Sequence, residues 1–191
     1  MKKIIAIIGA AVAVLLLGLA GFLGYLGLFS PVPVNEREMG PYTVVFESFV
    51  GPYAQTGGVF SRLYENLKAD GIETEDGIGL YYDDPRQVPA AQLRSDCACV
   101  LTPEQMVKAQ ALGTKYRFKT IEKSACLVAE FPIRLPMSYM IAPMKTYPAL
   151  MQAAQARGLT IGAPYEYYAM KAKKIIVAAP VLPKTETESE K

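Results

Sequence analysis

Glu166 is the side chain whose type and surroundings best suit it to chemistry, because it lies within a run of tyrosines, YEYY, at residues 165–168. On a strand, alternate residues share a face, so Glu166 and Tyr168 are predicted to point one way and their neighbours the other. A carboxylate beside aromatic rings suits cationic or amphipathic ligands, since the rings add cation–π attraction. Burial would also raise its pKa and make it a general acid or base. The alternative is a glutamate that simply faces solvent, as most do.

Several other kinds of site are excluded by composition. The chain has no histidine, which rules out Ser-His and Cys-His dyads. Its three cysteines do not have the spacing of zinc ligands. Gly57 and Gly58 are not followed by the Gly-Lys-Ser/Thr of a phosphate-binding loop. We therefore predict no metal and no cofactor.

The cysteines allow two interpretations. Cys97 and Cys99 are two residues apart on a predicted strand, so they share a face and are poorly placed to pair with each other. Either could meet Cys126 on a neighbouring strand. The alternative is that all three are small buried apolar side chains.

Charge argues against a nucleic-acid partner. The chain holds 20 basic and 18 acidic side chains, and two of the basic ones are Lys2 and Lys3, so the rest carries no formal net charge. A domain without a basic face has no electrostatic footprint for phosphate backbones.

An uncharged, apolar run at residues 4–29 follows these two lysines. About 20 such residues span a bilayer as a helix, so the run is predicted to be a signal anchor. A cleaved signal peptide is the alternative, with a small-residue site at residues 18–20. Because the basic residues precede the run, the positive-inside rule predicts a single-pass protein with a cytoplasmic N-terminus and an outward domain, periplasmic or extracellular in a bacterium.

The remainder reads as two similar units of strand, helix, strand and strand. Apolar periodicity and breaker residues predict strands at 42–50, 78–83, 93–101, 124–131, 160–170 and 174–181, and long helices at 55–69 and 137–157. In the second helix, Pro143 and Pro148 are expected to delay the start or bend the axis. Its Met140, Met144 and Met151 are expected to pack into the core.

The repeat assigns counterparts to the candidate site. Matching the segment 77–83 to the segment 162–169, with residue 83 opposite residue 169, makes Leu80 the counterpart of Glu166 and Tyr82 the counterpart of Tyr168. We therefore expect an α+β fold, with an antiparallel sheet and a cleft between two pseudo-symmetric halves that these residues line. The expected organisation is a transmembrane anchor at 1–30, a linker at 31–41, the domain at 42–183 and a disordered tail at 184–191.

The motifs and their order resemble a known family. Gly51-Pro52-Tyr53 before a helix, GIGLYYDDP at residues 77–85, LRSDCACVL at 93–101 and the strand with Glu166 before IIVAAPV at 175–181 are similar to GyrI-like small-molecule-binding domains. The likeness extends to the membrane-anchored branch around the testis-expressed ER-phagy receptor family. It implies an SHS2-type duplicated fold and a ligand cleft in which Glu166 matches the central strand glutamate, with Tyr53, Leu80, Tyr82 and Tyr168 around it.

Three functions remain open at this level. The leading hypothesis is a membrane-tethered module that binds a small amphipathic or cationic molecule, or a protein partner. The second is a hydrolase of reactive electrophiles with Glu166 as acid/base and Tyr82 or Tyr168 as polarising groups. The resemblance implies this chemistry, because some members of the family hydrolyse reactive small molecules with a pocket carboxylate. The third is a non-catalytic adaptor or receptor whose cleft is filled by side chains.

Overall fold

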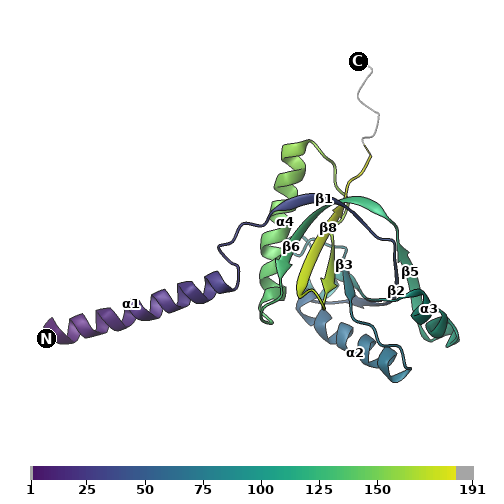
Figure 1. Ribbon diagram of the computed structural model, residues 1–191, viewed down its shortest axis with the longest axis horizontal. Helices are drawn as coiled ribbons and strands as arrows, with labels where there is room; N and C mark the ends of the chain where they lie inside the picture. The colour runs from purple at the N-terminus through teal and green to yellow at the C-terminus, as the bar shows by residue number, and fades with distance from the viewer. Residues whose placement is uncertain (1, 184–191) are drawn as a thin grey trace, which may run out of the picture.

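The fold is a curled antiparallel sheet with helices packed on its outer side. The computed structural model describes residues 2–183, and Figure 1 shows α1 (Lys2–Tyr25) projecting away from the domain. The sheet has eight strands in the order β1-β6-β8-β7-β3-β4-β2-β5. The predicted α+β class is therefore confirmed, while the tail predicted at 184–191 lies outside the described residues.

The predicted strands and long helices occur in the predicted order along the chain. The strands are β1 (Val34–Met39), β2 (Tyr42–Val50), β3 (Gly77–Tyr81), β4 (Arg94–Val100), β5 (Arg117–Ile121), β6 (Ser124–Pro132), β7 (Tyr165–Ala169) and β8 (Lys174–Pro180). The remaining helices are α2 (Thr56–Ala69), α3 (Pro103–Gln110) and α4 (Ser138–Arg157).

Two copies of one unit make up the sheet. The first is β2-α2-β3-β4, the second is β6-α4-β7-β8, and they meet where β3 pairs with β7. Each unit is preceded by a strand that joins the other unit: β1 pairs with β6, and β5 pairs with β2. The duplication predicted from the sequence is thus present, with exchanged edge strands that hold the halves together.

The segment predicted as a linker is partly a strand. β1 lies within residues 31–41 and pairs with β6 from Val34 opposite Ala129 to Met39 opposite Ser124. Its sequence, VNEREM, is mostly exposed and charged, which is typical of an edge strand and hides the apolar alternation by which strands are recognised. The folded sheet therefore begins before Tyr42.

Local signals place the helix ends well. Thr102 caps α3 by accepting a hydrogen bond from the Gln105 backbone N–H, and Pro103 is the first helical residue. Gly158 ends α4 in the left-handed conformation, with φ of 60°. The expectation that Pro143 and Pro148 delay α4 is wrong, because the helix already begins at Ser138.

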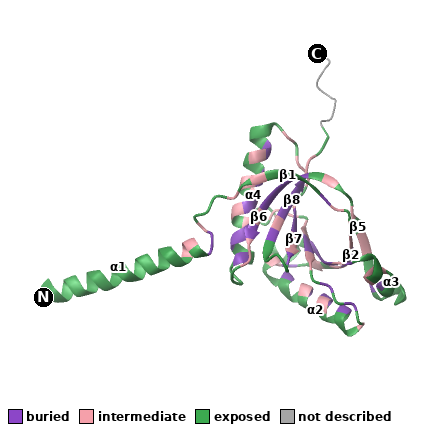
Figure 2. Cartoon of the chain, in the orientation of Figure 1, coloured by how far each residue is buried: buried purple, intermediate pink, exposed green. Residues whose placement is uncertain are grey.

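Buried side chains fill both faces of the sheet. On the outer face, one cluster lies against α4 and another lies beneath α2. The inner face of the curl is filled by a third cluster, which includes Val44, Ile78, Val128, Tyr165 and Ala178. Figure 2 shows this buried sheet, with α4 buried on one side and exposed on the other.

The end of α1 is docked onto the domain. Leu26, just after the helix, is fully buried in the cluster that also holds Phe131 and Leu150. The Lys145 ammonium of α4 donates to the backbone carbonyls of Gly27 at 3.0 Å and Leu28 at 2.5 Å, and also to that of Ser30. These contacts tie the turn that follows α1 to the middle of α4.

This docking makes a prediction about stability. Leu26→Ala should lower the free energy of unfolding by about 2–5 kcal/mol, because it opens a cavity in the core. Phe29→Ala is the matched control in the same turn, since Phe29 is 66% exposed. Chemical denaturation of both variants in the same detergent measures the difference. Equal stability of the two variants would contradict the docking.

Candidate functional site

Glu166 lies at the centre of the sheet, where the two units meet. In the β3–β7 pair it stands directly opposite Gly79, and it also pairs with Val177 of β8, whose side chain belongs to the cluster against α4. Its side chain therefore points to the helix side of the sheet. With 5% exposure, Glu166 is not the solvent-facing glutamate of the alternative interpretation.

Two glycines of β3 make room beside this carboxylate. A Cβ at Gly79 would lie 2.7 Å from Cε2 of Tyr81, so the Tyr81 ring occupies the space that a side chain would fill. A Cβ at Gly77 would contact the rings of Phe60 at 3.4 Å and Tyr168 at 3.6 Å. The GIG pattern of β3 thus lets aromatic rings lie close to the strand beside Glu166.

Tyrosine hydroxyls supply the hydrogen bonds of Glu166. Tyr168 donates to Oε2 at 2.8 Å, and Tyr147 of α4 donates to Oε1 at 3.2 Å. The hydroxyls of Tyr81 and Tyr168 are 2.8 Å apart. Because Tyr168 gives its single hydrogen to Glu166, Tyr81 is the donor in that pair. The result is a chain from Tyr81 through Tyr168 to the carboxylate.

Burial dominates the electrostatics of this group. It raises the pKa of Glu166 above its usual value of 4.5, and the hydrogen bonds from Tyr168 and Tyr147 offset only part of that rise. Burial and the nearby Glu166 charge both raise the pKa of Tyr168 and of Tyr147. Among the ion pairs of residues 2–183, none involves Glu166.

Tyr53, in the turn before α2, packs against Tyr81 of the same unit. Its ring meets the Tyr81 ring edge-on, with centroids 4.8 Å apart. Its hydroxyl accepts from the Asp83 backbone N–H at 3.0 Å and donates to the Asp83 carbonyl at 2.9 Å. The tyrosine of the GPY motif thus fixes the end of β3, the strand that carries Tyr81.

The structure gathers only part of the predicted set. Glu166 and Tyr168 are in contact, and Tyr53 reaches them through Tyr81. Leu80 packs instead with the cluster on the inner face of the sheet. Tyr82 donates to Asp96 at 2.7 Å and accepts from Lys119 at 3.0 Å, away from Glu166.

The reason is a shift of one residue in the correspondence between the units. Burial along the strands makes Gly79 the counterpart of Glu166 and Tyr81 that of Tyr168. A shift of one residue moves every side chain of a strand to the other face, so Leu80 and Tyr82 were assigned to the wrong side. Tyr81 was missed for this reason, although the Gly-x-Gly of β3 marks its place. Tyr147 lies on a helix and no local signal pointed to it.

The cysteines are all free and buried. Cys97 and Cys99 lie on β4, whereas Cys126 lies on β6, and these strands are not neighbours. Burial raises the pKa of Cys97 to about 12. All three are therefore small buried side chains, and neither Cys97 nor Cys99 pairs with Cys126.

Two surface pockets occur away from Glu166. One, of about 100 Å³, lies beside the turn after α1 and includes Gly27, Phe131 and Arg134. The other, of about 350 Å³, lies near Asp76, Thr102 and Lys171. Glu166 itself is enclosed by Tyr147 and Tyr168, which bond it, and by Tyr81, which bonds Tyr168.

Sequence comparison connects the chain to an animal protein. No family model matches it. It is 29% identical over 177 residues to the testis-expressed protein 264 homolog of Mus musculus, a match that covers 86% of this chain and 54% of the mouse protein. The chain thus spans about half the length of that relative.

Structural comparison decides the fold. EcmrR, solved in a complex with DNA, matches with a TM-score of 0.59 and 13% identity, over 94% of this chain and 69% of that one. Its C-terminal domain alone matches at 0.52. The fold is GyrI-like. A hydrolase from Listeria innocua shares the fold at a TM-score of 0.51 and 11% identity, over 82% of this chain and 95% of that one.

The buried carboxyl predicts a pH effect on stability. Between the usual pKa and the raised pKa, folded Glu166 keeps a proton that the unfolded chain has released, so stability falls as pH rises through this window. Glu166→Gln has no such proton. The free energy of unfolding of the natural protein, relative to this variant, should therefore decrease from pH 4.5 toward neutrality.

Glu130 provides a control of opposite sign. Lys174 and Arg37 hold its pKa below the usual value, so its contribution is lost as pH falls rather than as it rises. Denaturation of Glu166→Gln from pH 4.5 upward, and of Glu130→Gln from pH 4.5 downward, tests both signs. Parallel pH curves for the natural protein and Glu166→Gln would show that the carboxyl is not perturbed.

Proposed function

We propose that the protein is a membrane-anchored GyrI-like domain that binds a small amphipathic cation at Glu166. The observation that carries this proposal is a buried carboxylate that is surrounded by aromatic rings and has no cationic partner among the described residues. A buried charge without a counter-charge is costly. A cationic ligand supplies the missing charge and stacks on the rings.

Entry of a ligand depends on Tyr81. Its ring occupies the space over Gly79 that leads to Glu166. Turning this side chain away breaks its hydrogen bond to Tyr168 and exposes the carboxylate beside the Tyr168 ring, which meets the Phe60 ring edge-on at 5.4 Å. The ligand then replaces the Tyr81 ring, and its charge lowers the pKa of Glu166, so that binding releases a proton.

Binding of crystal violet, a triarylmethane cation, tests this function. The full chain in nanodiscs should bind the cation more tightly than its uncharged leuco form. Glu166→Gln should weaken cation binding by about tenfold or more, which corresponds to about 1.4 kcal/mol. Asp96→Asn is the matched control, because Asp96 is also buried but is paired with Lys119.

Tyr81→Ala separates access from affinity. Removal of the ring should speed association of the cation and leave its preference over the leuco form intact. Equal binding of the two forms, or binding that Glu166→Gln does not change, contradicts the proposal. If neither crystal violet nor its leuco form binds to the natural protein or to Tyr81→Ala, the adaptor alternative is favoured, in which side chains permanently fill the seam.

Hydrolysis of an electrophilic small molecule is the second candidate. It is favoured by the raised pKa of Glu166, which suits a general acid or base, and by the shared fold with the Listeria hydrolase. Glu166 would take a proton from the attacking water and return it to the oxygen of the opened ring, while the Tyr168 hydroxyl turns from Glu166 to polarise that oxygen. Diol formation from styrene oxide that disappears in Glu166→Gln would assign this activity; the binding proposal expects no product.

The anchor in this proposal is α1. By length and composition it fits a membrane span or a signal sequence. We favour an uncleaved span, because the residues after it continue directly into the core through Leu26. Lys2 and Lys3 then place the N-terminus in the cytoplasm and the domain on the outer side.

A labelling experiment tests this orientation. Val107 on α3 is 68% exposed, and the three natural cysteines are buried, so Val107→Cys offers a single accessible thiol. An impermeant maleimide should label it in intact cells, and the labelled chain should remain in the membrane fraction. Labelling only after lysis would reverse the orientation, and a labelled chain released from the membrane would indicate cleavage.

A further inference from the structure

The outward side of α4 carries a stripe of apolar side chains that the domain does not cover. We call it the α4 stripe; it consists of Met137, Met140, Met144, Pro148 and Met151. Met140 and Met144 are each 71% exposed, and Met151 is 60% exposed. The expectation that these methionines pack into the core is therefore wrong.

This stripe is unusual for a helix that faces water. Such helices normally carry charged residues on the side away from the core. From Ser138 to Gln155, α4 has a single charged residue, Lys145. The Lys145 ammonium is held by the carbonyls of the turn that follows α1. The outward side of α4 is thus apolar and uncharged over most of its length.

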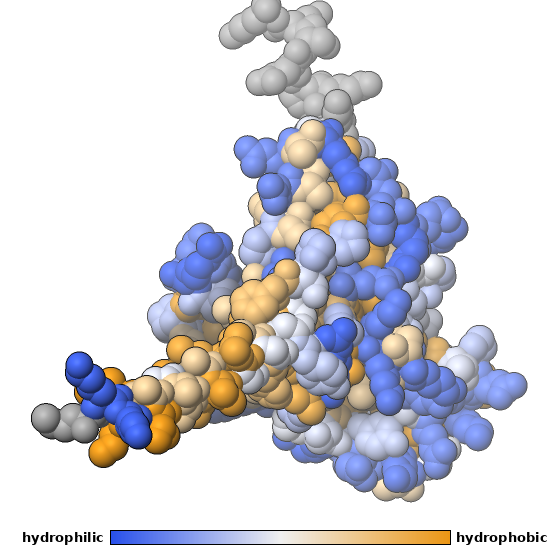
Figure 3. Space-filling view, turned by 60° about the vertical axis from the view of Figure 1, so that its left-hand side comes forward, coloured by the Kyte–Doolittle hydropathy of each residue, from blue (hydrophilic) through white to orange (hydrophobic). Residues whose placement is uncertain are grey.

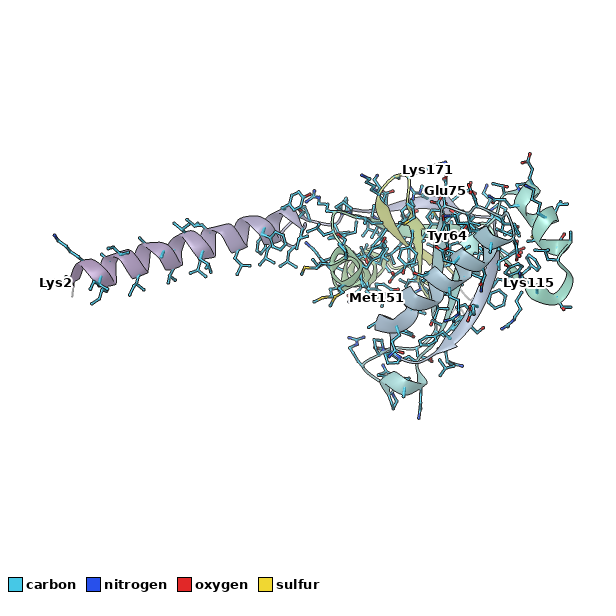
Figure 4. All side chains as sticks on the ribbon, turned by 90° about the horizontal axis from the view of Figure 1, so that it is seen from below. Lys2, Tyr64, Glu75, Lys115, Met151 and Lys171 are labelled. Atoms are coloured by element: carbon cyan, nitrogen blue, oxygen red, sulfur yellow. The ribbon has the colours of Figure 1, made fainter. Side chains whose placement is uncertain are left out.

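The docking of α1 fixes where the stripe faces. Besides the Lys145 contacts, Arg134, just before α4, lies 5.1 Å from the centre of the Tyr25 ring at the end of α1. In Figure 1, α4 runs across the direction of α1, on the side of the domain from which α1 projects. Figure 4 places Met151 on that same side, whereas Tyr64 and Lys115 lie further from α1.

The apolar surface is continuous with α1. Phe29, in the turn that follows α1, is 66% exposed. Figure 3 shows hydrophobic residues extending from α1 onto the adjacent surface of the domain, while hydrophilic residues dominate the surface further away.

We propose that the α4 stripe lies in the interface of the bilayer that α1 spans, with α4 parallel to the membrane surface. This inference rests on the proposed role of α1 as a membrane span. A helix placed in this way buries its apolar face about 5–10 Å into the boundary between headgroups and acyl chains. Methionine suits such a site, because its flexible side chain adapts to an irregular surface.

The geometry favours lipid over a second copy of the chain. If α1 crosses the bilayer, a face that looks along α1 toward its N-terminus looks at the membrane. A second copy anchored in the same bilayer would stand beside the first and meet it through the lateral surfaces of the domain. Lipid is therefore the occupant that the position of the stripe fits.

Tryptophan fluorescence tests this placement directly, since the chain contains no tryptophan. Met144→Trp would report on the stripe. Val107→Trp is the matched control, because Val107 is 68% exposed on α3, a helix away from α1. Leu15→Trp would report on α1 itself. Each full-length variant is placed in phosphatidylcholine nanodiscs at one copy per disc, with or without phosphatidylcholine brominated in the upper acyl chain.

Brominated lipid should quench the emission of Trp at position 144 about twofold, because the stripe lies at the depth of the quencher. It should quench the tryptophan at position 15 and leave that at 107 unchanged. Acrylamide, a quencher dissolved in the water, should instead quench the tryptophan at position 107 more strongly than the one at position 144. Adding Met140→Glu and Met151→Glu to Met144→Trp should abolish the lipid quenching, because both charges would have to enter the interface.

Each outcome decides the question. Quenching at 15 without quenching at 144 overturns the placement of the stripe and leaves the anchor intact. No quenching at either position overturns the anchor and, with it, this inference. A different result is an emission at position 144 that shifts to the blue only with two copies per disc and stays unquenched by the brominated lipid. That result would assign the stripe to contact with a second chain. Binding of crystal violet is a separate measurement, so its failure would leave this result unaffected.

Discussion

The pairing of β3 with β7 is the contact on which the rest of the molecule depends. It joins two units into one continuous sheet, and it sets Glu166 opposite Gly79 at the junction. The missing side chain at Gly79 leaves room for the Tyr81 ring, whose hydroxyl completes the chain to the carboxylate through Tyr168. The exchanged edge strands β1 and β5 reinforce this junction from both ends of the sheet.

Local patterns were sufficient for most of the fold and insufficient for the lining of the site. The order of the elements and the prominence of Glu166 followed from spacing and residue type. The partners of Glu166 did not, because side chains on a strand alternate and an error of one residue placed Tyr82 where Tyr81 belongs. Only the pairing of distant strands settles that register. β1 was missed because its polar residues reflect an exposed edge, not a half-buried strand.

α4 shows a different limit of sequence reasoning. Helical periodicity shows that Met140 and Met144 share a face, but it does not show which apolar face meets the sheet. Leu150 and Ala154 occupy the buried side, and this assignment depends on contacts with β6 and β8. The same helix carries Tyr147, which binds Glu166, and Lys145, which holds the end of α1. One rigid element therefore joins the carboxylate to the end of the proposed anchor.

The meeting of Gly79 and Glu166 also bears on how such a molecule could have arisen. These two residues are each other's counterparts, so a symmetric dimer of one unit would place two glutamates, or two glycines, face to face. Two buried carboxylates at directly opposed positions of a sheet would repel each other. Two glycines would leave no charge at all. A chain in which the two copies are fused and have diverged keeps one acidic group and gives it the space left by the missing side chain at Gly79.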